Sequence, residues 1–508
     1  MTPQKIPRSS IACLVLALAG CTLGPDPQRP LTVADQAPGY VHAPPAESTT
    51  ASDLDPWWTS FGDAATAELV EAALSHNTDL KVAAARVIEA QAALGSARST
   101  LWPTMDVSFA GSRTKNSFTL PEVGRVSVYS TTYAPSLDVS YQLDLFGRLE
   151  RTRQAAWSDL LAQEAARRTM LHTVVAETVR ARTRIGTLQR SLDLAVDVRD
   201  SWAATLASID RRYRSGLVES LDLRLARENL ASAEATVVET QQALDSARLA
   251  LDVLVGRRPG TGRLATGLPA LPDLAPVPVG LPADLLDRRP DLIQAEMVLA
   301  SRTARVGVAL AELYPDLRLT ASAGTSSETL DDVLSSDATV YNAVLNLLAP
   351  IFDGGRRRAE VAASRARVEQ AAATYAGAVL QALREVEDAL VRDQAVAQRL
   401  RFLRQRAEEA RAADRIARDR YGRGVATLLQ VLETERRMRS SEQALLAAQA
   451  DAWNGRIDLY LALGGDWLPA DQTDDTSEHP DTETARLEQH IPPNDRTALS
   501  TIGQTLDE

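Results

Sequence analysis

Ser140-Tyr141-Gln142-Leu143-Asp144-Leu145-Phe146-Gly147-Arg148 returns later in the chain as Ala349-Pro350-Ile351-Phe352-Asp353-Gly354-Gly355-Arg356, so one pattern occurs twice. The two Gly-Arg pairs are 208 residues apart, and the same spacing separates Arg212-Tyr213-Arg214-Ser215-Gly216 from Arg420-Tyr421-Gly422-Arg423-Gly424. Upstream, Leu101-Trp102-Pro103 matches Leu313-Tyr314-Pro315 at a spacing of 212. Self-similarity at a fixed period predicts a duplicated structural unit. The difference between the two spacings falls between the Pro and Gly-Arg landmarks, where a loop at the tip of each unit can vary in length.

The N-terminus reads as an export signal that ends in a lipid-attachment site. Lys5 and Arg8 precede a short apolar run over 11–19, and Leu18-Ala19-Gly20-Cys21 follows. Such a run is too short to span a bilayer as a helix and is typical of a signal peptide. Leu-Ala-Gly-Cys resembles the bacterial lipobox, which implies cleavage before Cys21 and lipidation of its thiol. The alternative is an ordinary signal peptide with an incidental cysteine.

Composition excludes several classes of protein. The 508 residues carry a net charge of −12, and residues 470–508 alone contain ten acidic residues against two arginines. We interpret this acidic tail as disordered, and the charge balance is not that of a nucleic-acid binder. The two cysteines cannot form a disulfide in the processed chain because Cys13 lies within the signal. After Cys21 no run of 18 apolar residues suggests a transmembrane helix.

Helical periodicity dominates the rest of the chain. Apolar residues recur at threes, fours and sevens from Leu69 to about Thr100, with a joint predicted at Asn77-Thr78-Asp79. Residues 149–210 and 357–420 contain no proline, so each predicts one helix roughly 90 Å long. Each such helix ends at an Arg-Tyr-x-x-Gly motif, where Gly216 and Gly424 can adopt the left-handed turn. A returning helix is then predicted over 221–254 and over 428–463.

The period changes from 3.6 to 2 before each Gly-Arg pair, which indicates strands. Met105, Val107 and Phe109 alternate with polar residues, as do positions 133–143, 317–323 and 341–347. The polar stretch 111–127 is predicted to be a turn. Strands of about 10 residues suffice to cross a bilayer when tilted. Two soluble hairpins packed on helices are the alternative.

These elements predict a fold that is mainly α-helical with a small β part. We divide the chain into segments as follows: signal peptide 1–20; lipid anchor and extended linker 21–56; first repeat 57–256 with a β-hairpin at 103–147; linker 257–283; second repeat 284–468 with a β-hairpin at 315–350; acidic tail 469–508.

Residues able to carry catalysis are not arranged for it. The five histidines are not paired at metal-ligand spacing, and the glycines of 256–262 lack the Lys-Ser/Thr of a phosphate loop. We therefore expect no enzyme, no metal and no cofactor. Four strands cannot close a transmembrane barrel, and an open edge in lipid leaves backbone groups unsatisfied. Copies of the chain must complete the wall, and two, three or four subunits are possible.

The chain resembles the TolC-like outer-membrane efflux factors, specifically the NodT/OprM lipoprotein branch. The resemblance covers about 21–468 and rests on motifs in the correct order, which are 140–148, 350–356, 285–292 and 459–467. It implies a homotrimer with a 12-stranded barrel in the outer membrane and a helical barrel in the periplasm. It also implies docking to a periplasmic adaptor protein and an inner-membrane pump, and passive export of small molecules through the duct.

The resemblance also implies a gate at the periplasmic tip. In that family residues just after the second Arg-Tyr-x-x-Gly motif close the tip, and the matching positions are Leu429, Gln430 and Glu433. Leu429 and Glu433 share a helical face, so three copies would form an apolar ring and an anionic ring, whose carboxylates would raise one another's pKa and attract cations. The family's tip arginine is replaced by Ala426. Solvation of Glu433, and simple helix-end packing of Arg212-Tyr213 and Arg420-Tyr421, are the alternatives.

Two rival classes remain. A lipid-anchored coiled-coil scaffold without a pore accounts for the helices but not for strands at two matching places. A periplasmic adaptor has one helical hairpin, whereas this chain predicts two. The sequence does not identify the exported substrate, the class of pump or the role of the tail.

Overall fold

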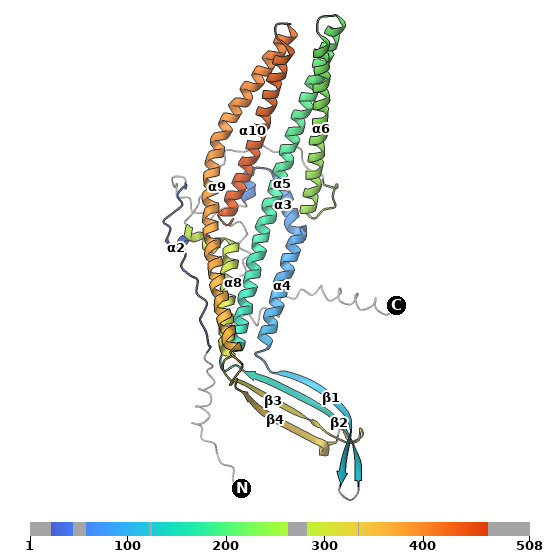
Figure 1. Cartoon of the computed structure of the whole chain (residues 1–508), viewed down its shortest axis with the longest axis vertical. Coiled ribbons are helices and arrows are strands. Elements are labelled where there is room, and N and C mark those ends of the chain that lie inside the picture. Colours follow the sequence, from blue (N-terminus) through green and yellow to red (C-terminus); the bar gives the residue numbers. More distant parts are fainter. Residues whose placement is uncertain (1–21, 44–56, 121–123, 263–281, 334, 466–508) are drawn as a thin grey trace.

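The computed structural model describes residues 22–43, 57–120, 124–262, 282–333 and 335–465. Cys21, the signal peptide, most of the linker 257–283 and the acidic tail 469–508 lie outside the described residues. Figure 1 shows an elongated molecule with two helical hairpins pointing to one end and a β-sheet at the other.

Two long helices run the length of the helical part. They are α5 (Arg148–Arg214) and α9 (Arg356–Gly422), each of 67 residues and therefore about 100 Å long. The helix α6 (Ser220–Leu254) returns along the upper part of α5, and α10 (Leu428–Ala462) returns along α9 (Figure 1). The long helices and their returning partners are thereby confirmed within a few residues.

Shorter helices complete the lower part of each repeat. The first repeat has the 3₁₀ turn η2 (Trp57–Phe61), α3 (Ala64–His76) and α4 (Thr78–Ser99). The second has η3 (Pro282–Asp284), α7 (Leu285–Arg288) and α8 (Pro290–Ala311). The predicted joint is confirmed, because Asn77 accepts hydrogen bonds from the backbone N–H groups of Asp79 and Leu80 and so caps α4.

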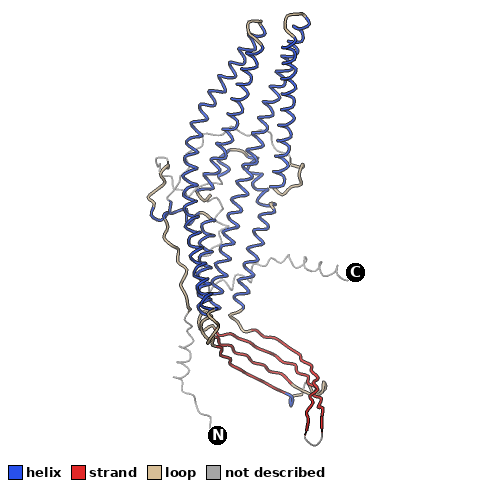
Figure 2. The backbone as a smooth tube through the Cα atoms, viewed as in Figure 1, coloured by secondary structure: helices blue, strands red, loops and turns tan. Residues whose placement is uncertain are grey.

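The strands, drawn in red in Figure 2, form one antiparallel sheet, and their order is β1-β2-β3-β4. They are β1 (Thr104–Leu120), β2 (Gly124–Leu143), β3 (Asp316–Thr325) and β4 (Thr339–Leu348), with the 3₁₀ turn η4 (Ser336–Ala338) before β4. Each repeat supplies one hairpin, and β2 pairs with β3 to join them.

The prediction of a turn over 111–127 is wrong. β1 and β2 pair without interruption from Thr104↔Ser140 to Leu120↔Gly124, so most of that stretch is strand. Its threonine, serine, valine and tyrosine residues favour strands even though they are largely polar. The ladder continues because a hairpin outside a core needs no apolar face to keep its backbone hydrogen bonds.

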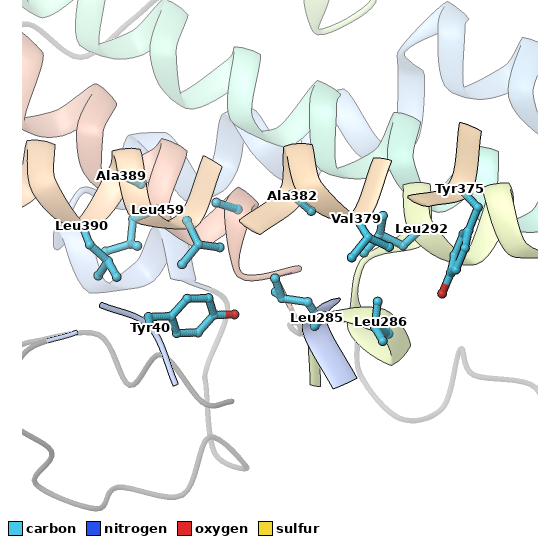
Figure 3. Packing of buried hydrophobic residues seen from close by; sticks show 13 residues of the cluster. Tyr40, Leu285, Leu286, Leu292, Tyr375, Val379, Ala382, Ala389, Leu390 and Leu459 are labelled. Atoms are coloured by element: carbon cyan, nitrogen blue, oxygen red, sulfur yellow. The ribbon is translucent and has the colours of Figure 1, made fainter. Parts of the chain in front are cut away.

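The two repeats share their core. Phe61 stacks on Trp453 at 4.4 Å and Trp57 on Tyr460 at 5.4 Å, which joins the start of the first repeat to the end of the second. A second cluster lies along α9, where Val379, Val386 and Leu390, at the seven- and four-residue spacings of a coiled-coil seam, are buried (Figure 3).

The segment 22–43 runs along the helices as a strap with one helical turn, α2 (Val33–Gln36). Tyr40 inserts its ring into the cluster of Figure 3. The Glu387 carboxylate accepts hydrogen bonds from the backbone N–H groups of Val41 and His42 at 2.7 and 3.1 Å. Near the sheet, the buried Arg151 forms an ion pair with Asp26 at 2.9 Å.

Candidate functional site

The sheet has one apolar face. Strand residues alternate between the two faces, and the register places apolar residues beside apolar residues and polar beside polar across all four strands. One face carries Met105, Val107, Phe109, Pro135, Leu137, Val139, Tyr141, Leu143, Leu317, Leu319, Ala321, Ala323, Tyr341, Ala343, Leu345 and Leu347. Most of these large apolar side chains are exposed in the single chain. An apolar face of this size is unfavourable in water and favourable in lipid.

The opposite face is mostly polar. It carries Thr104, Asp106, Ser108, Ser136, Asp138, Ser140, Gln142, Arg318, Thr320, Ser322, Asn342 and Asn346. Asp106 and Asp138 are direct cross-strand partners, and the hydroxyl of Ser136 donates to the Asp138 carboxylate at 2.8 Å. A hollow of about 290 Å³ lies beside these two carboxylates. The sheet thus separates an apolar from an aqueous side.

The sheet has two edges without a strand partner among the described residues. β1 pairs only with β2 and β4 only with β3 in this part of the chain. Because β1 and β4 are antiparallel in this order, β4 of one copy can continue the sheet on β1 of another.

The predicted strand-to-helix junctions lie where the sheet meets α5 and α9. Gly147 and Gly355 have φ of +74° and +91°, a conformation that favours glycine. Asp144 accepts a hydrogen bond from the Glu150 N–H at 2.8 Å, and Asp353 accepts one from the Arg357 N–H at 3.2 Å, so each aspartate caps its helix.

The two junction arginines differ. Arg148 approaches the Asp316 carboxylate of β3 at 3.9 Å, which ties the first junction to the second hairpin. Phe146 stacks on Tyr314 at 4.8 Å and strengthens the same connection. Arg356 is exposed.

The two Arg-Tyr-x-x-Gly motifs form the same turn at the helical tips. Leu217 N–H donates to the Arg212 carbonyl at 2.9 Å and Val425 N–H to the Arg420 carbonyl at 3.0 Å. With Gly216 and Gly424 at φ of +71° and +76°, each is a Schellman motif. The left-handed glycine turn predicted at both helix ends is confirmed.

The side chains of the two motifs are not equivalent. The Arg212 guanidinium lies 5.3 Å from the centroid of the Tyr421 ring, and its Nη1 donates to the Tyr421 carbonyl at 3.3 Å. Tyr421 is only 9% exposed, whereas Tyr213 is 42% exposed and Arg420 is exposed. Burial raises the pKa of the Tyr421 phenol, and Asp222 adds to the effect. This contact joins the tips of the two repeats.

The predicted gate residues start α10. Leu429 is 73% exposed and points away from the cores of the chain. Gln430 and Thr427 form a capping box, since the Thr427 N–H donates to the Gln430 amide oxygen at 3.3 Å. Glu433 accepts hydrogen bonds from Arg436 and Arg437, the shortest of them 2.6 Å.

Those hydrogen bonds from Arg436 and Arg437 lower the pKa of Glu433 to about 2. The raised pKa expected from the sequence concerns three carboxylates in a ring, which a single chain does not contain. The role of Leu429, Gln430 and Glu433 in a gate stays a prediction.

The structure also contains a group of buried charged side chains near the tip that was not predicted from the sequence. Glu435 is 3% exposed, and Asp414 and Glu442 are also buried. Arg418 donates to Asp414 at 2.7 Å and Arg411 to Glu442 at 2.6 Å. A cavity of about 400 Å³ between α5, α9 and α10 is lined by Asp414, Arg418, Arg411 and Glu442 and by Asp193 and Asp197, whereas Glu435 lies outside its lining. A signal was present: Val431, Glu435, Met438, Glu442 and Leu445 follow a 4-3-4-3 spacing, which places two glutamates on the apolar seam of α10.

Within the part of the chain that the structure describes, no group of His, Cys, Asp and Glu could hold a metal ion. No described helix has the length and apolarity that crossing a bilayer would require.

A strand wall with one apolar face, continued by helical hairpins about 100 Å long, defines the class of outer-membrane channel proteins that extend into the periplasm. The comparisons give the family: the chain belongs to the outer membrane efflux protein family, whose model matches residues 69–257 and 281–465.

Relatives and solved structures agree with this assignment. The solvent efflux pump outer membrane protein SrpC of Pseudomonas putida is 33% identical over 461 residues, which are 89% of this chain and 97% of SrpC. OprJ of Pseudomonas aeruginosa is 31% identical over 90% of this chain and 95% of its own. The outer-membrane channel OprN is similar in structure, with a TM-score of 0.80, 30% identity and coverage of 88% and 100%. The resemblance inferred from the motifs is confirmed, and an outer-membrane efflux channel is the function; a pore-free scaffold is not favoured.

Proposed function

We propose that three copies of this chain form a closed duct that carries small molecules passively across the periplasm and the outer membrane. The observation that carries the proposal is the four-stranded sheet, which has one apolar face and, among the described residues, no strand partner at either edge. Lipid offers no hydrogen bonds to such edges, so each must pair with a strand of a neighbouring copy. Three sheets of four strands give a 12-stranded barrel, whose even strand number lets all pairs be antiparallel.

The helical hairpins supply the periplasmic part of the duct. Hairpins of 67- and 35-residue helices from three copies would form a tube of six hairpins, closed at the tip by Leu429 and Glu433. The relatives are named for solvent, toluene and antibiotic efflux pumps. We propose the same arrangement here, with a periplasmic adaptor and an inner-membrane pump as partners and the pump as the energy source.

The anchor belongs to the same proposal. Thr22, the residue after Cys21, packs against Gly147 at the strand-to-helix junction, so that a Cβ on Gly147 would lie 2.7 Å from its Cα. A lipidated Cys21 would therefore start at the membrane end of the helical part.

The test compares two neighbouring residues of β4. Leu345 lies on the apolar face beside Leu319, and Val344 lies on the polar face beside Thr320. Leu345→Lys places a charge in lipid, which costs about 2–4 kcal/mol at mid-membrane in each copy. We expect this variant to be lost from outer-membrane fractions, whereas Val344→Lys inserts and changes the single-channel conductance.

Deletion of the protein should also increase sensitivity to an exported compound. Equal insertion of the two lysine variants, or a wild-type protein that is a monomer without conductance after detergent extraction, would refute the duct.

A further inference from the structure

The β1–β2 hairpin extends well beyond the rest of the sheet. β1 has 17 residues and β2 has 20, whereas β3 and β4 have 10 each. The ladder between β1 and β2 has no skipped residue, so side chains keep their alternation to its end. Figure 1 shows this hairpin projecting from the sheet on the side away from the helices. In the proposed duct it therefore lies at the outer leaflet.

The chemistry of the apolar face changes in steps along this hairpin. Met105, Val107 and Phe109 come first. The next position, Gly111, is covered by the ring of its cross-strand partner Tyr133, since a Cβ on Gly111 would lie 3.6 Å from Tyr133 Cδ1. The following positions of the same alternation are Arg113 and Lys115. Hydrocarbon, then tyrosine, then cations is the order of chemistry across the edge of a membrane.

Lengths place these cations in the headgroup layer. The apolar positions of β2 from Leu143 to Tyr133 span ten residue steps, about 33 Å along the strand, or about 25 Å of height at a tilt of about 40°. That is the height of the apolar band of an outer-membrane barrel. Arg113 then lies about 5 Å and Lys115 about 10 Å beyond the edge of the band, where lipid headgroups lie.

Within the part of the chain that the structure describes, neither cation is neutralised by an acidic side chain. The Arg113 guanidinium lies 5.6 Å and the Lys115 ammonium 5.3 Å from the centroid of the Tyr129 ring. Among the described residues no carboxylate forms an ion pair with Arg113 or Lys115. The acid of β1, Asp106, is on the opposite face, and Glu122 lies outside the described residues.

We propose that Arg113, Lys115 and Tyr129 form a binding site for the phosphate groups of an anionic glycolipid of the outer leaflet, one site on each copy. The guanidinium and the ammonium bind phosphate oxygens, and the tyrosine ring, which contacts both cations, keeps them side by side within the headgroup layer. The site rests on the proposed function, since it needs the apolar face to be in lipid. It would fix the depth of the barrel in the outer leaflet.

The experiment titrates the detergent-extracted full chain with bisphosphorylated lipid A and counts bound lipid by native mass spectrometry. Each basic residue at an anionic surface contributes about fivefold, so R113Q/K115Q should bind about 25-fold more weakly than the wild type. The matched control is Arg125→Gln, which removes a cation from the same hairpin about 20 Å beyond the edge of the band, or about 10 Å past Lys115. It should bind as the wild type does, and so should the charge-preserving R113K/K115R.

Three results would overturn the site. They are unchanged lipid A binding by R113Q/K115Q, an equal loss in Arg125→Gln, and wild-type binding of dephosphorylated lipid A at full strength. Displacement of lipid A by inorganic phosphate would assign the cations to a soluble anion and also overturn it. Conductance is recorded on the same preparations: a conducting wild type with unaltered binding in R113Q/K115Q rejects the site alone, whereas a wild type without conductance rejects the duct and with it the site.

Discussion

Arg212→Ala should increase opening of the periplasmic tip. In the structure the Arg212 side chain of α5 reaches the carboxyl end of α9, where it contacts both the ring and the carbonyl of Tyr421. A cation–π contact contributes about 0.5–2 kcal/mol, and a hydrogen bond from a charged donor about 1.5 kcal/mol. Arg212 is half-buried and the hydrogen bond is 3.3 Å long, so we assign the pair about 1–2 kcal/mol.

That free energy corresponds to a change of about 5- to 30-fold in the ratio of closed to open tips, if the contact is lost on opening. Single-channel recording of the reconstituted protein measures this ratio directly. In cells, uptake of a large hydrophilic antibiotic should rise in parallel. Arg212→Lys keeps a charge over the ring and should lie between the wild type and Arg212→Ala.

The matched control for this prediction is Arg214→Ala. Arg214 is exposed and pairs with Asp210 of its own helix at 2.6 Å, so its loss leaves the connection between repeats intact. If Arg212→Ala opens no more often than Arg214→Ala, the contact with Tyr421 is helix-end packing and not a latch.

Burial raises the pKa of Glu435, and Asp414 raises it further, while Arg439, Arg418 and a hydrogen bond from Trp202 oppose the shift. When the pKa of a carboxyl is raised by folding, the protein loses stability as the pH rises through that pKa. Glu435→Gln should therefore unfold at a higher temperature than the wild type at about pH 7, and this gain should vanish at about pH 4. An equal difference in unfolding temperature at the two pH values would contradict the prediction. Glu433→Gln leaves Arg436 and Arg437 without their carboxylate partner, so the preference of the channel for cations should fall. The fall should be the same at about pH 5 and pH 8 because the pKa of Glu433 is about 2. An unchanged reversal potential in a salt gradient would count against a place of Glu433 at the gate. Gly355→Ala should lower the free energy of unfolding by about 1 kcal/mol through backbone strain alone. Gly147→Ala should lower it by more because its Cβ would also collide with Thr22. Thermal unfolding and proteolysis of residues 22–43 measure both variants, and equal effects would show that the strap does not pack against Gly147.

Much of the fold could be predicted because the long helices and strands follow strict periods. The 208-residue repeat, the glycines at 147, 216, 355 and 424, and the seam of α9 each have a local physical reason, such as a left-handed turn or a buried stripe. The prediction of a turn over 111–127 is wrong because polar threonine, serine and tyrosine residues are compatible with strands as well as loops, and the hairpin keeps its ladder while only its side chains change.

Contacts between distant segments could not be predicted. The sequence shows Arg212 and Tyr421 as members of two motifs but gives no reason why one arginine is half-buried and the other exposed. The pairing of Glu433 with Arg436 and Arg437 was open to prediction, since they are three and four residues apart on one helix. The buried charges of α10 were recognisable from the seam spacing, but their partners on α9 depend on how the helices pack.

The side chains of the two Arg-Tyr-x-x-Gly motifs make different contacts, as expected for a subunit of a closed ring. Within the described part of the chain the first repeat gives its arginine to the tyrosine of the second repeat, while Arg420 and Tyr213 are exposed. In the proposed trimer, hairpins of the first and second repeats alternate around the tube, so half of the junctions between hairpins lie within a chain and half lie between chains. Applying the internal repeat to the junction within a chain brings Arg420 to face Tyr213 of the next copy. The two exposed side chains, Arg420 and Tyr213, are therefore the pair that the junction between copies needs, and the tip would be held by three contacts of each kind.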